Sequence, residues 1–187
     1  MDLIRADQAQ QMIVSDHLRP QPGDQVLDVG CGDGRVRAIL GDVNYVGVDL
    51  NDDYLEAAER ISGSDTRFVH ADVASLVSLG LGPFDLGMAL GLHHHLDDES
   101  VVKLIRDVAG AVRPGGRYVS VDPVFAPDGR TTARVLAALD RGRYVRDETG
   151  YRRLFDDSPF ELESVQIRHD LLPFPYSHCI IEARRVA

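Results

Sequence analysis

Short apolar runs alternate with amphipathic stretches along the first two thirds of this chain. Five of the runs are typical of buried strands, at residues 25–29, 45–50, 67–70, 84–90 and 117–121. Four other stretches place apolar side chains at helical spacing, at residues 3–18, 35–40, 52–61 and 98–112. The alternation of strand and helix predicts a parallel sheet with helices on both faces.

The helix predicted over 98–112 has the clearest boundaries. Asp97 is a typical N-cap, and the sequence Pro114–Gly115–Gly116 ends the helix. Asn51 or Asp52 can cap the helix over 52–61 in the same way. The buried face of the 98–112 helix is expected to consist of Val101, Leu104, Ile105, Val108 and Val112.

Residues 123–160 break this alternation. They are rich in proline and glycine and hold one helical stretch, around residues 130–140. We interpret residues 123–160 as an insertion over the sheet. Residues 161–170 and 176–185 are typical of two strands joined by a turn at Pro173–Pro175, which predicts an antiparallel hairpin.

The composition predicts one domain over residues 1–187, with residues 1–20 as an N-terminal helix. Hydrophobic residues make up 44% of the chain and charged residues 27%, as in ordinary globular proteins. Cys31 and Cys179 form neither a disulfide framework nor a zinc motif, so we expect no metal site. We find no apolar stretch of membrane-spanning length and no signal peptide, and therefore expect a cytoplasmic protein.

The net charge is −10, from 20 Lys and Arg against 30 Asp and Glu. A surface that binds nucleic acid or anionic membranes requires excess positive charge, so the overall charge argues against both partners. A local basic patch is still compatible with this balance.

A glycine-rich turn follows the first predicted strand, in the sequence Val26–Arg35 (VLDVGCGDGR). Gly30, Gly32 and Gly34 permit a tight turn and let a ligand approach the backbone closely. A nicotinamide fingerprint would place the third glycine one residue later, where Arg35 stands, and the lysine of a phosphate-binding P-loop is missing. The turn therefore predicts a ligand of another kind.

Acidic residues follow the ends of the first three predicted strands. Asp28 and Asp33 would repel a pyrophosphate, so they favour a ligand that carries positive charge. Asp49 can accept hydrogen bonds from ribose hydroxyls, and Asp72 follows the third strand. Because the carboxyl ends of parallel strands face one crevice, Asp28, Asp49 and Asp72 should converge there.

With these features, the chain resembles the class I S-adenosylmethionine-dependent methyltransferases. VLDVGCGDGR is similar to the first motif of that family, VGVDLN to its ribose-acid motif and HADV to its adenine motif. FDLGMALGLHHHL and AVRPGGRYVSVDP are similar to its fourth and fifth strand segments. The resemblance implies a three-layer, doubly wound α/β fold with a seven-stranded, mostly parallel sheet and an antiparallel C-terminal hairpin.

The resemblance also implies which residues bind the methionine part of S-adenosylmethionine. Asp28 would lie near the methionine ammonium, together with the backbone at Leu90. Gly30, Cys31 and Gly32 would line the amino-acid part of the cofactor.

The adenosine part would be bound by residues that follow the second and third strands. The resemblance implies that Asp49 binds the ribose hydroxyls and that Leu50 lies against the adenine. Asp72 would accept a hydrogen bond from the adenine amino group, with Val73 beside it.

Three consecutive histidines, His93–His95, follow the fourth strand. A hydroxyl acceptor benefits from a base, and histidine is the natural candidate near neutral pH. We take His94 as the candidate catalytic base, the alternative being that these histidines only pack at the start of the next helix. Asp122, after the fifth strand, is either a carboxylate at the edge of the pocket or part of an ordinary turn.

The predicted insertion carries a local excess of arginine. Seven arginines and three acids lie within residues 130–153, with tyrosines between them. Because the arginine fork suits carboxylates and phosphates, we hypothesise that Arg143, Tyr144 and Arg146 bind an anionic or polar group of a small acceptor. The insertion would then be a substrate-side lobe; the alternative is a solvated arginine-rich face.

The function expected from the resemblance is methyl transfer from S-adenosylmethionine to a small molecule, at oxygen or nitrogen. The segment after the fourth strand lacks the Asn/Asp-Pro-Pro-Tyr motif of DNA-adenine and protein-glutamine methyltransferases. The alternatives are an RNA or protein methyltransferase, or a protein that binds the cofactor without turnover.

Overall fold

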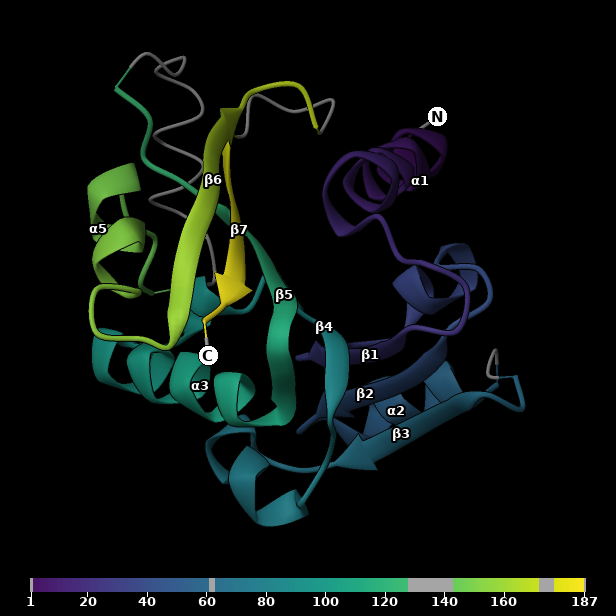
Figure 1. Ribbon diagram of the computed structural model, residues 1–187. Helices are drawn as coiled ribbons and strands as arrows, with labels where there is room; N and C mark the ends of the chain where they lie inside the picture. Colours follow the sequence, from purple (N-terminus) through teal and green to yellow (C-terminus); the bar gives the residue numbers. More distant parts are fainter. Residues whose placement is uncertain (1, 61–62, 128–142, 172–176, 187) are drawn as a thin grey trace.

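The computed structural model describes residues 2–60, 63–127, 143–171 and 177–186. Within them, seven strands form one sheet in the order β3-β2-β1-β4-β5-β7-β6 (Figure 1). Strands β1 to β5 are parallel, and β7 lies antiparallel between β5 and β6. The strands are β1 (Gln25–Val29), β2 (Asn44–Asp49), β3 (Thr66–His70), β4 (Phe84–Leu90), β5 (Val112–Pro123), β6 (Phe160–Arg168) and β7 (His178–Arg185).

Helices cover both faces of the sheet, as the alternation of strand and helix predicted. One apolar core lies under α3, η3 and α5, and the other under α1, η1, η2 and α2. The helices are α1 (Asp2–Ile13), η1 (Val14–Leu18), η2 (Arg35–Ile39), α2 (Asp52–Glu59), η3 (Val73–Leu79), η4 (His93–His95), α3 (Asp98–Ala111) and α5 (Glu148–Arg153). The sheet and the helices on its two faces confirm the three-layer α/β fold.

Each helix in the described part of the chain is too short or too polar to cross a membrane.

The two predicted helix caps are present. The side chain of Asn51 accepts a hydrogen bond from the Tyr54 amide at the start of α2. The side chain of Asp97 accepts one from the Ser100 amide at the start of α3. The predicted apolar face of α3 is buried, with Leu104 2% exposed.

The boundary between α3 and β5 differs from the prediction. The helix ends at Ala111, and β5 begins at Val112 rather than at residue 117. Val112 pairs with Phe84, and the register with β4 then shifts before Arg117 pairs with Leu86. Gly115, at a φ of 76°, permits this irregularity, so the strand starts before the glycines instead of after them.

The elements near both ends of the chain agree with the predicted ranges 3–18, 161–170 and 176–185 to within about two residues. The first helix continues through η1, a π-helical turn, and ends at Arg19 with a φ of 43°. The C-terminal strands form the predicted antiparallel pair, with Phe160 opposite Arg185. The predicted helix around 130–140 and the turn at Pro173–Pro175 lie outside the described residues.

Candidate functional site

The carboxyl ends of β1, β2, β4 and β5 place most of the predicted site residues along one edge of the sheet. Val29 pairs with Val48, and Leu90 pairs with Val121. The glycine turn, Asp49 and the histidine turn therefore follow neighbouring strands. Helix α1 lies on the other side of the sheet from α3 (Figure 1).

The glycine turn has a backbone that only glycine adopts easily. Gly30, Gly32 and Gly34 have φ values of 73°, 54° and 69°. The Gly30 amide donates to the Val48 carbonyl at 2.8 Å, which folds the turn over the end of β2. A Cβ on Gly30 would lie 2.9 Å from the Leu92 side chain, whereas a Cβ on Gly32 would have no atom within 4 Å. The Gly32 backbone thus has open space beside it.

Asp49 connects the glycine turn to α2. Its Oδ2 accepts from the Gly32 amide at 2.7 Å, and its Oδ1 accepts from the Asn51 amide at 2.9 Å. A carboxylate has about four lone-pair positions, so two amides fix its orientation and leave acceptor capacity. Leu50, the next residue, is an apolar side chain with 62% exposure.

Asp72 and Val73 lie just beyond β3, at the start of η3. The Ala71 amide donates to the carbonyl of Asp49 at 3.0 Å, which brings this segment beside the end of β2. Asp72 is exposed, and its Oδ1 accepts from the Ala74 amide at 2.9 Å, so it also caps η3. Val73 is half-buried and packs against the core.

Asp28 lies in the interior, below the glycine turn, with 2% exposure. The Tyr45 hydroxyl donates to its Oδ2 at 2.6 Å. Burial raises the pKa of Asp28 to about 7, although the Tyr45 hydrogen bond opposes the shift. The same carboxylate and burial raise the pKa of Cys31 above its ordinary range, so this thiol stays protonated.

The histidine turn, η4, is held against β5 by Asp122. Asp122 is 1% exposed and belongs to β5 rather than to a turn. Its Oδ1 lies 3.0 Å from Nδ1 of His94 and accepts from the His94 amide at 3.2 Å. The Gly91 amide donates to the Val121 carbonyl at 2.7 Å, which fixes the start of the same turn. His94 and Asp122 thus form a buried dyad.

His93 occupies a different, fully buried position next to this dyad. Its Nε2 lies 2.8 Å from the Tyr118 hydroxyl. Its Nδ1 is 3.4 Å from Oδ2 of Asp122, but neither atom makes a hydrogen bond within the described residues. Burial lowers the pKa of His93, an effect that Asp122 opposes. A neutral His93 therefore packs behind His94.

The predicted substrate-binding residues differ in exposure and in their hydrogen-bond partners. Arg143 and Tyr144 are exposed, and the Tyr144 amide donates to the His94 carbonyl at 3.0 Å. Arg146, in contrast, is 9% exposed and bonds to acceptors of the protein itself, including the His93 carbonyl at 2.9 Å. In this geometry Arg146 is not presented to an acceptor molecule, because its donors are already used. The predicted Arg130, Arg134 and Arg141 lie outside the described residues.

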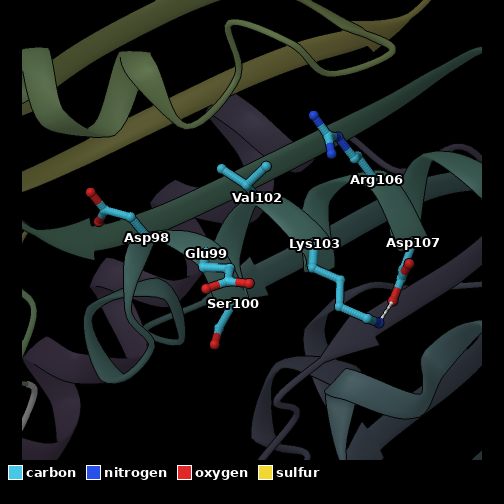
Figure 2. A pocket seen from close by; sticks show the side chains of 7 residues that line it. All are labelled: Asp98, Glu99, Ser100, Val102, Lys103, Arg106 and Asp107. Atoms are coloured by element: carbon cyan, nitrogen blue, oxygen red, sulfur yellow. Dashed lines mark hydrogen bonds and ion pairs between the residues drawn. The ribbon is translucent and has the colours of Figure 1, made fainter.

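A hollow on the surface runs along the outer side of α3 and contains none of the predicted site residues (Figure 2). Within it, Lys103 contacts Asp107 at 2.5 Å. The residues that line it are Asp98, Glu99, Ser100, Val102, Lys103, Arg106 and Asp107. In the described part of the chain, no three His, Cys, Asp or Glu side chains are arranged to hold a metal ion.

From the sequence, Asp122 had two possible roles, and neither the contact of Tyr118 with His93 nor the internal role of Arg146 was predicted. The signal that could have identified Asp122 was its position near the end of a strand. Its strand lies beside the strand that leads to the histidines, as the strand that ends at Asp49 lies beside the strand that leads to the glycine turn. The glycine turn, Asp49 and the His94–Asp122 dyad thus follow neighbouring strands at one edge of the sheet.

Comparisons with known proteins point to methyltransferases. A family model described as a methyltransferase domain matches residues 26–116. An O-methyltransferase of Pyrenophora dematioidea is 28% identical over 179 residues, which cover 86% of this chain and 63% of that protein. The 27-O-demethylrifamycin SV methyltransferase of Amycolatopsis mediterranei is 34% identical over 131 residues, 66% of this chain and 46% of that protein. The chain thus spans roughly half of the length of these curated relatives.

A solved structure shares the fold. The geranyl diphosphate C-methyltransferase of Streptomyces coelicolor, crystallised with S-adenosyl-L-homocysteine, superposes with a TM-score of 0.77 at 16% identity. The match covers 96% of this chain and 81% of that one. Together, the family model and the relatives support a class I S-adenosylmethionine-dependent methyltransferase, and the solved structure shows the shared fold.

Proposed function

We propose that this chain transfers the methyl group of S-adenosylmethionine to a hydroxyl group of a small molecule. The observation that carries the proposal is the His94–Asp122 dyad, with 3.0 Å between Nδ1 and Oδ1, at the strand edge that holds the glycine turn. The O-methyltransferase of Pyrenophora dematioidea and the O-methyltransferase cnsE of Penicillium expansum, which is 31% identical over 169 residues, support oxygen rather than nitrogen as the acceptor atom.

The cofactor would lie across the glycine turn and the end of β2. Gly32 supports this position, since its backbone is strained for other residues and open to a ligand. Gly30 and Cys31 form the rest of the turn. We assign Asp49 to the ribose hydroxyls and the exposed Leu50 to one face of the adenine. When bound, the sulfonium supplies an activated methyl group.

The two ends of the cofactor would meet different groups. Asp72, with Val73 beside it, is exposed at the end of β3 and can accept from the adenine amino group. At the other end, the Leu90 backbone and Asp28 would face the methionine ammonium. Because the pKa of Asp28 is about 7, a cation close to it would favour its charged form.

The dyad can serve as a general base. When Nδ1–H of His94 is donated to Asp122, the tautomer places the basic lone pair on Nε2. The acceptor oxygen would form its bond to the methyl carbon as the carbon–sulfur bond breaks, and its proton would pass to Nε2. Such a base contributes roughly 10²- to 10⁴-fold to the rate.

The acceptor is proposed to be small and to bear a polar or anionic group near Arg143 and Tyr144. Both residues are exposed, and the backbone of Tyr144 contacts the turn that carries His94. An RNA acceptor is the alternative, since a tRNA (carboxymethyluridine(34)-5-O)-methyltransferase of Saccharomyces cerevisiae is 33% identical over 107 residues. The net charge of −10 favours a small molecule.

Two measurements test the proposal in sequence. Calorimetric titration with S-adenosylhomocysteine, with NADH as the control ligand, should show binding of the former alone. Labelled S-adenosylmethionine is then used with a panel of small phenols and hydroxy acids, and with tRNA. A His94→Gln variant should bind S-adenosylhomocysteine within about twofold of the wild type and lose roughly 10²-fold or more of its turnover. Full turnover in this variant would remove His94 as the base, and labelling of tRNA alone would replace the small acceptor.

A further inference from the structure

We propose that Arg146 is a positioning residue that holds the turn carrying His94 and joins it to the strand carrying Asp122. This inference deepens the proposed function and rests on its assignment of His94 as the base. It gives Arg146 a role inside the protein in place of contact with the acceptor.

The guanidinium of Arg146 makes four hydrogen bonds and an ion pair with nearby acceptors. Nη1 donates to the carbonyls of His93 and Tyr144, each at 2.9 Å. Nη2 donates to the Leu96 carbonyl at 2.8 Å and lies 2.7 Å from Oδ1 of Asp98. Nε donates to the same carboxylate oxygen at 2.7 Å. Since the His93 and Leu96 carbonyls flank the turn, one side chain holds both of its ends.

The backbone of Arg146 contacts the residues that follow β5, the strand that carries Asp122. Arg146 forms a parallel bridge with Val124, and its carbonyl accepts from the Phe125 amide at 3.0 Å. Val124 comes two residues after Asp122 in the sequence. The backbone of Arg146 is therefore tied to the end of β5, while its side chain is tied to the His94 turn.

A contact from Tyr144 strengthens this connection. Its amide donates to the His94 carbonyl at 3.0 Å. Residues 144–146 thus donate to the carbonyls of His93, His94 and Leu96, all within one short turn. Within the turn the His93 carbonyl also accepts from the Leu96 amide at 3.1 Å, and residues 144–146 supply the contacts to the His94 and Leu96 carbonyls.

The geometry at position 146 requires arginine specifically, and a lysine would not replace it. The side chain of Arg146 is 8% exposed, and its guanidinium lies 5.7 Å from the centre of the Tyr151 ring. A planar fork reaches carbonyls on two sides and a carboxylate at its end. A lysine ammonium donates from a single point and lacks Nε and the second terminal nitrogen, so it could not reproduce all of the contacts with His93, Tyr144, Leu96 and Asp98.

The test compares Arg146→Lys with Arg152→Ala, a control in the same segment. Arg152 is an exposed arginine that pairs with Glu148 one helical turn away. The ring nitrogens of His94 are observed by NMR in ¹⁵N-labelled protein and assigned with His94→Gln. This measurement reads which nitrogen carries the proton and needs neither cofactor nor acceptor.

We expect Arg146→Lys to shift His94 from one tautomer to a mixture and to lose the Nδ1–H signal of the contact with Asp122. Arg152→Ala should leave both signals as in the wild type. The affinity for S-adenosylhomocysteine should stay within about twofold in both variants. Unchanged His94 signals in a folded Arg146→Lys protein would overturn the inference.

Asp98→Ala provides a second variant in case Arg146→Lys does not fold. The Asp98 side chain is 80% exposed, so its removal should leave the core intact, and it withdraws the acceptor of the Nε hydrogen bond and the ion-pair partner of Nη2. We expect a smaller change of His94 in the same direction, and the absence of any change contradicts the inference. Failure of wild-type protein to bind S-adenosylhomocysteine would instead contradict the proposed function and leave the NMR comparison readable.

Discussion

Asp122 contacts His94 twice through a single oxygen atom. Oδ1 lies 3.0 Å from the ring Nδ1 and accepts from the backbone amide at 3.2 Å. The ring contact orients the imidazole, and the amide contact fixes the turn from which it projects. One carboxylate thus sets both the tautomer and the place of the proposed base.

Replacement of Asp122 by asparagine tests this arrangement. The amide group of Asp122→Asn keeps one acceptor oxygen but loses the negative charge, so both contacts with His94 become weaker. We expect turnover to fall roughly 10²-fold or more while the affinity for S-adenosylhomocysteine changes less than about threefold. Kinetics and calorimetry on the same preparation measure both. The exposed Asp156→Asn serves as the control, and equal turnover in the two variants would argue against the dyad.

The buried Asp28 predicts a dependence of stability on pH. Its pKa is about 7 in the folded protein and 3.8 in a free chain, so between these values the folded state binds a proton that the unfolded state has released. The contribution of Asp28 to the free energy of unfolding therefore decreases as the pH rises from about 4 to 7. Urea unfolding of ligand-free wild type and Asp28→Asn at pH 5 and pH 8 should show a smaller decrease in the variant. Parallel decreases would contradict the raised pKa.

Gly30 tests the backbone of the glycine turn. Gly30→Ala must adopt a φ of 73° and place its Cβ 2.9 Å from Leu92. We expect a loss of about 1–2 kcal/mol from the left-handed backbone alone, and at least tenfold weaker binding of S-adenosylhomocysteine. Gly110→Ala is the matched control, because its Cβ meets open space on α3 and should stabilise the helix by roughly 0.5–1 kcal/mol. Thermal unfolding and calorimetry distinguish the two; normal ligand affinity in Gly30→Ala would show that the turn does not contact the cofactor.

Asp49 tests the ribose site. Asp49→Asn keeps an acceptor for the Gly32 amide but loses the charge and one acceptor oxygen. Hydrogen bonds to charged groups contribute about 1.5–3 kcal/mol, which corresponds to roughly 10- to 100-fold weaker binding of S-adenosylhomocysteine. The exposed Asp53→Asn, on the first turn of α2, should bind normally. If both variants bind equally well, the ribose lies elsewhere.

Much of the fold could be predicted from local pattern. The boundaries of β1 and β4 agree with the predicted ranges 25–29 and 84–90, because apolar runs end there at glycines or at a Gly–Pro pair. Asn51 and Asp97 cap the expected helices, since capping depends only on residues three positions away. The start of β5 at Val112 was missed because its pairing with Phe84 involves a distant strand.

In the candidate site, too, some features follow from local sequence and others depend on contacts between distant segments. Sequence alone determined the glycine turn and the acids Asp28, Asp49 and Asp72, because glycine conformation and the common edge of parallel strands follow from local rules. Only the tertiary structure decided that Asp122 contacts His94 and that Arg146 is directed inward. Those partners are 28 and about 50 residues away along the chain, and which acceptor a buried donor finds depends on how separate elements pack rather than on the sequence around it.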